Sequence, residues 1–116
     1  MKKILSLIVI CLILTACSSK YETITTNEAL DLIDKGAIVI DVRSLNEYNE
    51  GHIKGAINIP FDEIENITYD KDDTIIVYCA SGVRSSNAAN ILSDMGYTSL
   101  YNLDGGLLNW GSDLEE

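Results

Sequence analysis

Basic residues, histidine and cysteine are all scarce in this sequence of 116 residues. Its 8 Lys and Arg side chains stand against 18 Asp and Glu, which gives a formal net charge of −10 at pH 7. Such acidity argues against a nucleic-acid partner and against adhesion to anionic lipid through surface charge. The one histidine and the scattered carboxylates lack the spacing of metal ligands, so we predict no metal and no cofactor.

The sequence has one long apolar run, and it lies at the amino terminus. Met1-Lys2-Lys3 precedes an apolar stretch over residues 4–14, which ends in Leu14-Thr15-Ala16-Cys17. The stretch is too short to span a membrane, and its basic start and small closing residues predict a cleaved signal peptide. The last four residues resemble the lipobox of bacterial lipoproteins, which implies that Cys17 is lipidated and becomes the first mature residue. The alternative is an ordinary signal peptide that leaves Cys17 free.

These features predict a signal peptide over residues 1–16, a lipidated tether over residues 17–20 and one domain over residues 21–116. About 100 residues suffice for one small hydrophobic core. Cys11 is then lost with the signal peptide and Cys17 carries lipid, so Cys79 is the only thiol of the folded part. No internal disulfide can form. We expect a monomer, anchored by lipid on the extracytoplasmic side of a bacterial membrane.

A strand, a short loop and a helix are predicted in succession around Cys79. Thr74–Tyr78 is a β-branched and aromatic run typical of a strand buried on both faces. Helical spacing of apolar residues follows at Ala88, Ile91, Leu92 and Met95. This order places the Cys79 thiol at the carboxyl end of a sheet, which is where open α/β sheets bind ligands.

The loop after Cys79 has the residue types of an anion-binding site. Gly82 permits a positive φ, so that successive backbone N–H groups can turn inward. The helix start adds unpaired N–H groups and the positive end of a dipole, and Arg84 adds a planar fork of donors. These neighbours predict a lowered thiol pKa and a nucleophilic thiolate. A buried structural cysteine is the alternative.

The rest of the chain alternates between strand-like and helix-like segments. Capping-box patterns over residues 25–28 and 44–47 predict two helix starts. Further strands are expected over residues 21–24, 37–42, 56–58 and 99–103, and further helical turns over residues 60–67 and 107–110. This alternation predicts an α/β sheet that is covered on both faces.

Four motifs in this order and spacing resemble those of single-domain rhodaneses, a family of sulfurtransferases. They are Asp41-Val42-Arg43, then Glu47 with residues 51–60, then Tyr78-Cys79 through Arg84, and finally Gly105-Gly106 with Trp110. The resemblance covers roughly residues 21–112 and implies a parallel five-stranded sheet flanked by helices on both faces. It also implies a persulfide on Cys79. The remaining implied site residues form an anion pocket from the backbone of Ala80, Ser81, Gly82 and Val83, closed by Arg84.

The resemblance implies a reaction in two half-reactions. Cys79 takes a sulfane sulfur from thiosulfate or from a persulfide or polysulfide, and passes it to a thiol or a cyanide-like acceptor. Two alternatives are a non-catalytic binding lipoprotein of the same fold and a cysteine-dependent phosphatase of related fold. The phosphatase loop has five residues between Cys and Arg, whereas this loop has four, which favours sulfur over a phosphoryl group.

The other charged residues of these motifs are expected to serve the scaffold. Asp41 and Arg43 end a strand near the predicted pocket, and Arg43 could pair with Glu47 or with another carboxylate. His52 is interpreted as structural, because a thiolate needs no general base to attack thiosulfate.

Overall fold

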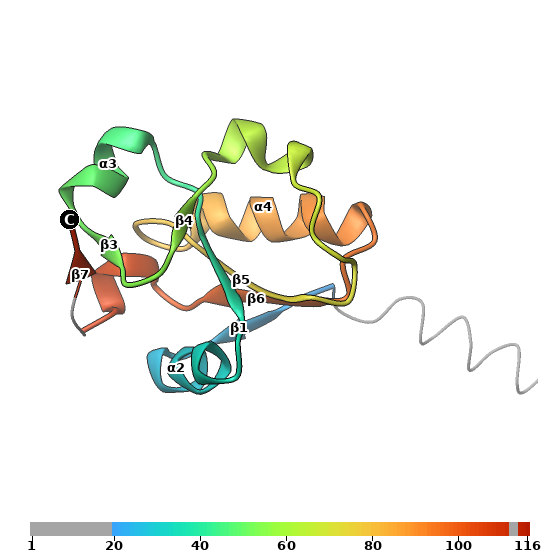
Figure 1. Ribbon diagram of the computed structural model, residues 1–116, viewed down its shortest axis with the longest axis horizontal. Helices are drawn as coiled ribbons and strands as arrows, with labels where there is room; N and C mark the ends of the chain where they lie inside the picture. Colours follow the sequence, from blue (N-terminus) through green and yellow to red (C-terminus); the bar gives the residue numbers. More distant parts are fainter. Residues whose placement is uncertain (1–19, 112–113) are drawn as a thin grey trace, which may run out of the picture.

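The computed structural model describes residues 20–111 and 114–116 (Figure 1). The predicted signal peptide, the lipidation site at Cys17 and most of the predicted tether lie outside the described residues. In the described part, no helix is both long and apolar enough to cross a membrane.

Five parallel strands form the central sheet, in the order β1-β6-β5-β2-β4. Their bounds are β1 (Glu22–Ile24), β2 (Ile38–Asp41), β4 (Ile57–Asn58), β5 (Thr74–Tyr78) and β6 (Ser99–Leu103). The apolar run that was predicted as a central strand is β5, which pairs with β2 on one side and β6 on the other. The predicted α/β fold with a five-stranded parallel sheet is confirmed.

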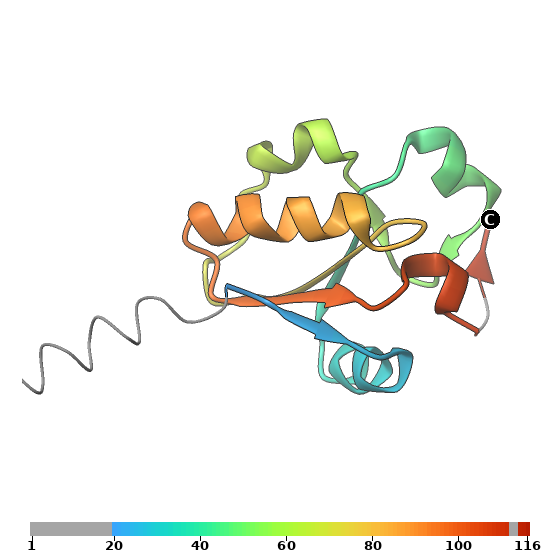
Figure 2. The same ribbon diagram turned by 180° about the vertical axis from the view of Figure 1, so that it is seen from behind.

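Helices cover both faces of this sheet (Figures 1 and 2). On one face lie α4 (Val83–Asp94) and the 3₁₀ helix η1 (Phe61–Asn66), and on the other lies α2 (Thr26–Asp34). Alternation along β5 builds both cores: Ile75 and Val77 belong to the cluster that includes α4 residues, whereas Ile76 and Tyr78 belong to the one that includes Ala29 of α2. Both faces of β5 are therefore buried, as its sequence predicted.

The remaining elements gather around the carboxyl ends of the strands (Figure 1). They are α3 (Leu45–Glu50), β3 (His52–Ile53), the 3₁₀ helix η2 (Gly106–Asn109) and β7 (Leu114–Glu115). Strands β3 and β7 form a two-stranded antiparallel sheet. The sequence does not predict this pair, because two-residue strands are too short to show a periodicity.

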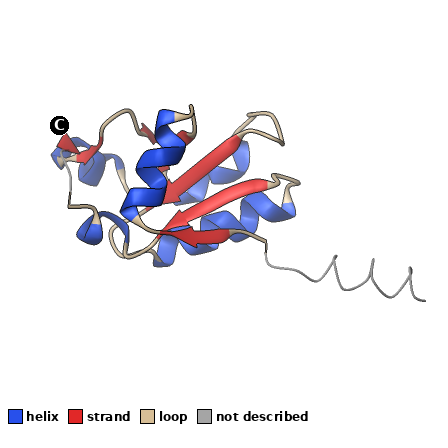
Figure 3. Cartoon of the chain, turned by 90° about the horizontal axis from the view of Figure 1, so that it is seen from below, coloured by secondary structure: helices blue, strands red, loops and turns tan. Residues whose placement is uncertain are grey.

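The five strands of the central sheet are parallel, and the arrowheads of its longer strands point the same way in Figure 3. The described chain therefore enters β1 at the side of the sheet where the amino ends of the strands lie, called here the amino edge. The carboxyl terminus lies toward the opposite side, where the carboxyl ends of the strands lie, called the carboxyl edge (Figure 1). The loop after β5 lies at the carboxyl edge.

Candidate active site

Cys79 follows β5 directly, in the middle of the sheet, and its residue is 1% exposed. The N–H of Gly82 donates a hydrogen bond to Cys79 Sγ at 3.0 Å. Gly82 adopts a left-handed conformation, with φ at 106°, as the residue before α4. The loop therefore curls back over the sulfur in the way that the glycine predicted.

Ser85 lies behind the sulfur and was not among the predicted site residues. This fully buried side chain sits in the first turn of α4, with its Oγ 3.5 Å from Cys79 Sγ. The same Oγ is 2.6 Å from Asn102 Oδ1, and Asn102 Nδ2 donates to the carbonyl of Gly82 at 3.4 Å. Because a hydroxyl has one hydrogen, Ser85 can donate either to the sulfur or to Asn102.

Burial raises the pKa of the Cys79 thiol, because it disfavours the charged form. Hydrogen bonds from the Ser85 side chain and from the backbone N–H groups of Ser85, Gly82 and Ser81 oppose this effect and outweigh it. The net result is a thiol pKa below its ordinary value. The helix start and the loop therefore favour the thiolate, which is the nucleophilic form.

The segment that contains Gly105-Gly106 packs against the backbone of this loop. The N–H of Leu107 donates to the Cys79 carbonyl at 2.9 Å, and the N–H of Leu108 donates to the Ala80 carbonyl at 3.1 Å. A Cβ on Gly106 would lie 2.4 Å from the Cys79 carbonyl oxygen and 2.7 Å from the carbonyl group of Ala80. Only a glycine permits this approach, so the motif does more than form the predicted turn.

Arg84 lies at the edge of the loop and is bound by a carboxylate from another element. Its Nη1 donates to Glu47 Oε1 at 3.0 Å and its Nη2 donates to Glu47 Oε2 at 3.1 Å. The two side chains are 43% and 34% exposed. The hydrogen bonds from Arg84, opposed in part by burial, lower the pKa of Glu47 to about 2. The sequence predicted Arg84 at the pocket but named no carboxylate partner for it.

Arg43 makes its ion pair with Asp41, the second of the two predicted alternatives. Its Nε and Nη2 donate to both Asp41 oxygens at 2.7–3.1 Å, and Nη2 also donates to the Gly51 carbonyl. The Tyr78 hydroxyl donates to Asp41 Oδ2 at 2.8 Å and accepts from the Ile53 N–H. This buried network ties β2, β5 and β3 together beneath the loop, which is a scaffold role.

His52 is buried and held by Tyr48. The two rings stack at 3.7 Å between centroids, and His52 Nδ1 lies 2.9 Å from the Tyr48 carbonyl oxygen. Its Nε2 is 3.9 Å from a carboxylate oxygen of Glu115 in β7. One ring nitrogen thus has a hydrogen-bond partner at the end of α3, and the other faces a carboxylate of β7 beyond hydrogen-bond distance, which agrees with the structural interpretation.

The other predicted loop residues differ in their surroundings. The Ala80 carbonyl is taken by Leu108, the Ser81 N–H contributes to the lowered thiol pKa, and the Val83 side chain is 67% exposed. The sequence carried a signal for one residue that was missed. Asn102 is a buried polar residue inside the strand β6, where asparagine is disfavoured unless it has a specific partner.

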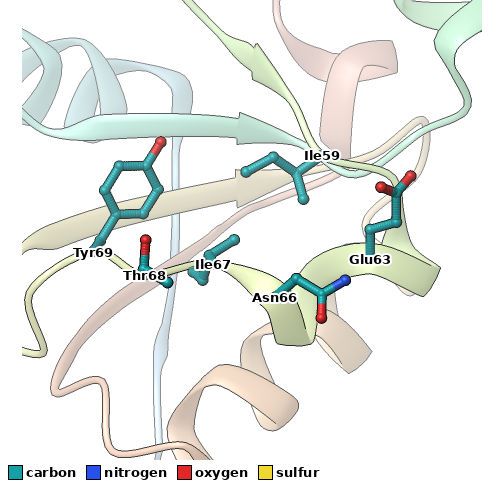
Figure 4. Close-up of a pocket in the computed structure, with 6 residues that line it drawn as sticks. All are labelled: Ile59, Glu63, Asn66, Ile67, Thr68 and Tyr69. Atoms are coloured by element: carbon teal, nitrogen blue, oxygen red, sulfur yellow. The ribbon is translucent and has the colours of Figure 1, made fainter.

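A cavity of about 320 Å³ has a lining that includes no residue of this loop (Figure 4). It is lined by Ile59, Glu63, Asn66, Ile67, Thr68 and Tyr69. No thiol and no cation belongs to this lining, and a carboxylate at its rim opposes the entry of an anion. The chemistry therefore places the candidate site at Cys79 and not in this cavity.

The chain belongs to the rhodanese-like domain family, whose model matches residues 25–113. A second model, the prokaryotic membrane lipoprotein lipid attachment site, matches residues 1–18. This match agrees with the lipobox interpretation of the amino terminus and indicates a lipid-anchored protein of the cell envelope.

Two relatives carry sulfurtransferase names. Thiosulfate sulfurtransferase GlpE of Shewanella oneidensis is 33% identical over 98 residues, which are 79% of this chain and 94% of that protein. Thiosulfate sulfurtransferase PspE of Escherichia coli is 46% identical over 70 residues, which are 57% of this chain and 67% of that protein. At the family level, these relatives support a rhodanese-type sulfurtransferase.

Solved structures share the fold. A rhodanese-related protein from Thermoplasma volcanium has a TM-score of 0.73 at 31% identity, over 82% of this chain and 98% of that one. A Rhodopseudomonas palustris protein of unknown function, described as a possible tyrosine phosphatase, has a TM-score of 0.73 at 27% identity, over 83% of this chain and 86% of that one.

Proposed function

We propose that the domain transfers a sulfane sulfur through a persulfide on Cys79. The observation that carries this proposal is the cluster of donors around Cys79 Sγ: the Gly82 N–H at 3.0 Å, the Ser85 hydroxyl and the start of α4. Each of them favours negative charge on Cys79 Sγ, which is the charge of the thiolate that attacks the donor.

The first half-reaction is a displacement at sulfur. The Cys79 thiolate forms a bond to the outer sulfur of a donor such as thiosulfate, the bond between the two donor sulfurs breaks, and sulfite leaves with its electron pair. In the second half-reaction, a thiolate or cyanide attacks the outer persulfide sulfur and the Cys79 thiolate is restored. No oxidant or reductant is consumed with cyanide as acceptor.

The test is a mass spectrum of the protein before and after incubation with thiosulfate. We expect a gain of one sulfur atom on the Cys79 peptide, and its removal by cyanide as thiocyanate. Cys79→Ser should show neither change. If no sulfane donor loads Cys79, the proposal is wrong.

The phosphatase alternative is favoured by one likeness, to the Rhodopseudomonas palustris protein. Against it stands the loop, in which four residues separate Cys79 from Arg84. A shorter loop offers fewer N–H groups to the three oxygens of a phosphoryl group. Hydrolysis of an aryl phosphate by the wild-type protein, abolished in Cys79→Ser, would support this alternative.

We further propose that residues 1–16 are a signal peptide and that Cys17 carries the lipid, with residues 21–116 as a monomeric domain outside the cytoplasm. The match to the lipid attachment site over residues 1–18 supports the lipid anchor.

A further inference from the structure

Arginine is scarce in this protein, and both arginines are already paired. The sequence contains only Arg43 and Arg84. Arg43 is buried against Asp41, and Arg84 is bound by Glu47. An anionic donor that approaches Cys79 therefore meets no arginine whose charge is free.

The pair between Glu47 and Arg84 occupies one full edge of the guanidinium. Both carboxylate oxygens accept from the two Nη atoms, which is the bidentate geometry that binds most strongly. Glu47 Oε1 also accepts from the backbone N–H and the hydroxyl of Ser44, at 3.1 Å each. Because this capping box fixes the carboxylate at the start of α3, Glu47 cannot swing away without losing those bonds.

The carboxylate has a larger effect on Arg84 than the sulfur has. The pKa of Arg84 is raised chiefly by its hydrogen bond to Glu47, whereas the charge of Cys79 contributes less. The pKa of Glu47 is about 2, so its carboxylate is ionised at any pH used for an assay. Arg84 and Glu47 together are nearly neutral, and the thiolate adds one negative charge beside them.

We propose that Glu47 selects sulfur donors by their charge. By offsetting the charge of Arg84, it disfavours donors with two negative charges relative to donors with one or none. This inference rests on the proposed function of Cys79. It assigns the preferred donor to the class of singly charged or uncharged sulfane carriers, such as an alkyl persulfide or a thiosulfonate.

Two donors of similar shape isolate the charge. Thiosulfate is a dianion, and methanethiosulfonate replaces one of its oxygens with a methyl group and is a monoanion. In each case a bond forms between the Cys79 thiolate and the outer sulfur, and the bond between the two donor sulfurs breaks. Sulfite leaves thiosulfate with the electron pair of that bond, and methanesulfinate leaves methanethiosulfonate in the same way. The ratio of the two kcat/KM values thus reports the charge preference of the site.

The variant to compare is Glu47→Gln in the full chain in a nonionic detergent. Glutamine keeps the capping box with Ser44 and one hydrogen bond to Arg84, so α3 should stay in place. We expect kcat/KM for thiosulfate to rise about twofold to fivefold, because the free energy of a partly exposed ion pair corresponds to a fold-change of this size. The kcat/KM for methanethiosulfonate should rise less. The difference should shrink as the salt concentration increases. Glu50→Gln, at the exposed end of the same helix, removes the same charge and should change neither value.

Two kinetic results would overturn the inference. A loss of kcat/KM with both donors would mean that Glu47 positions Arg84, and an equal gain with both would mean that it does not select by charge. If neither donor loads Cys79, the proposed function fails and alkylation decides about Glu47 by itself. The ratio of iodoacetate to iodoacetamide rates at the Cys79 peptide should then rise in Glu47→Gln, and an unchanged ratio would overturn the inference.

Discussion

At the residue scale, the chemistry of Cys79 depends on neighbours in the loop, in the first turn of α4 and in the adjacent strand β6. Gly82 reaches the sulfur with a backbone N–H, which only a substitution by proline would remove. Ser85 reaches it with a hydroxyl that Asn102 also engages. The side chain of Ser85 is therefore the contact that mutation can test most cleanly.

We predict that Ser85→Ala makes Cys79 a poorer nucleophile at neutral pH. The thiol pKa is lowered in part by this hydroxyl, so its loss should move the pKa upward and reduce the fraction of thiolate below that pKa. Loss of a hydrogen bond to a charged group corresponds to a decrease of about tenfold in the rate of alkylation by iodoacetamide at neutral pH. At high pH, where Cys79 is a thiolate in both the wild type and the variant, the two alkylation rates should converge.

The control is Ser86→Ala, one residue along α4. The Ser86 hydroxyl lies 2.6 Å from the Tyr21 hydroxyl and makes no hydrogen bond to the sulfur. Its alkylation profile should match that of the wild type. A Ser85→Ala profile that also matched the wild type would show that the hydroxyl stays with Asn102 in both protonation states.

At the scale of the elements, the loop is held by η2 rather than by its own contacts alone. The first turn of η2 donates two N–H groups to the carbonyls of Cys79 and Ala80. Leu107 packs against the core cluster that contains Trp110, whereas Leu108 is 81% exposed, so the two backbone N–H groups are the contacts that tie η2 to the loop. A substitution in η2 should therefore act on the site without touching it.

We predict that Gly106→Ala destabilises the fold more than Gly36→Ala does. Both glycines have positive φ, so both substitutions strain the backbone by about 1–2 kcal/mol. A Cβ at Gly36 meets nothing within 4 Å, whereas a Cβ at Gly106 would overlap main-chain atoms of Cys79 and Ala80. Urea unfolding should show an additional loss of at least about 2 kcal/mol for Gly106→Ala. Equal losses for the two variants would mean that η2 moves away from the loop at little cost.

At the scale of the whole molecule, the polarity of the parallel sheet separates the two functional ends of the protein. Residue 20 enters β1 at the amino edge, and Cys79 follows β5 at the carboxyl edge. An anchor on Cys17 would therefore hold the domain by the edge that is opposite the thiol. The thiol would then face the aqueous compartment, where water-soluble donors and acceptors are found.

We predict that Cys17→Ser removes the protein from the membrane fraction of a bacterial cell, or leaves it unprocessed. The wild-type protein reconstituted on the outside of vesicles should react with iodoacetate at Cys79 about as fast as the unanchored Cys17→Ser protein. A wild-type protein that stays soluble and unlipidated would refute the anchor. A strong decrease in the vesicle-bound rate would place the thiol against the bilayer.

Much of the fold and the position of the nucleophile could be read from local patterns. The strand Thr74–Tyr78, the two capping boxes at Thr25 and Ser44, and the glycine that curls the loop after Cys79 are as predicted. Each of these features depends on interactions between residues a few positions apart, so spacing and residue type were sufficient to predict it.

Only the tertiary structure determines which side chains contact the site residues. Glu47 and Arg84 are 37 residues apart, and Ser85 and Asn102 are 17 apart on different elements. Several partners for each charge are compatible with the sequence. Arg43 pairs with Asp41, and Glu47, the other predicted partner, pairs with Arg84. The packing of α3, η2 and the two-stranded sheet at the carboxyl edge selects among them, because long-range contacts depend on how elements stack and not on local periodicity. The amino-acid sequence by itself thus determined where the thiol lies, and the tertiary structure determined which charges surround it.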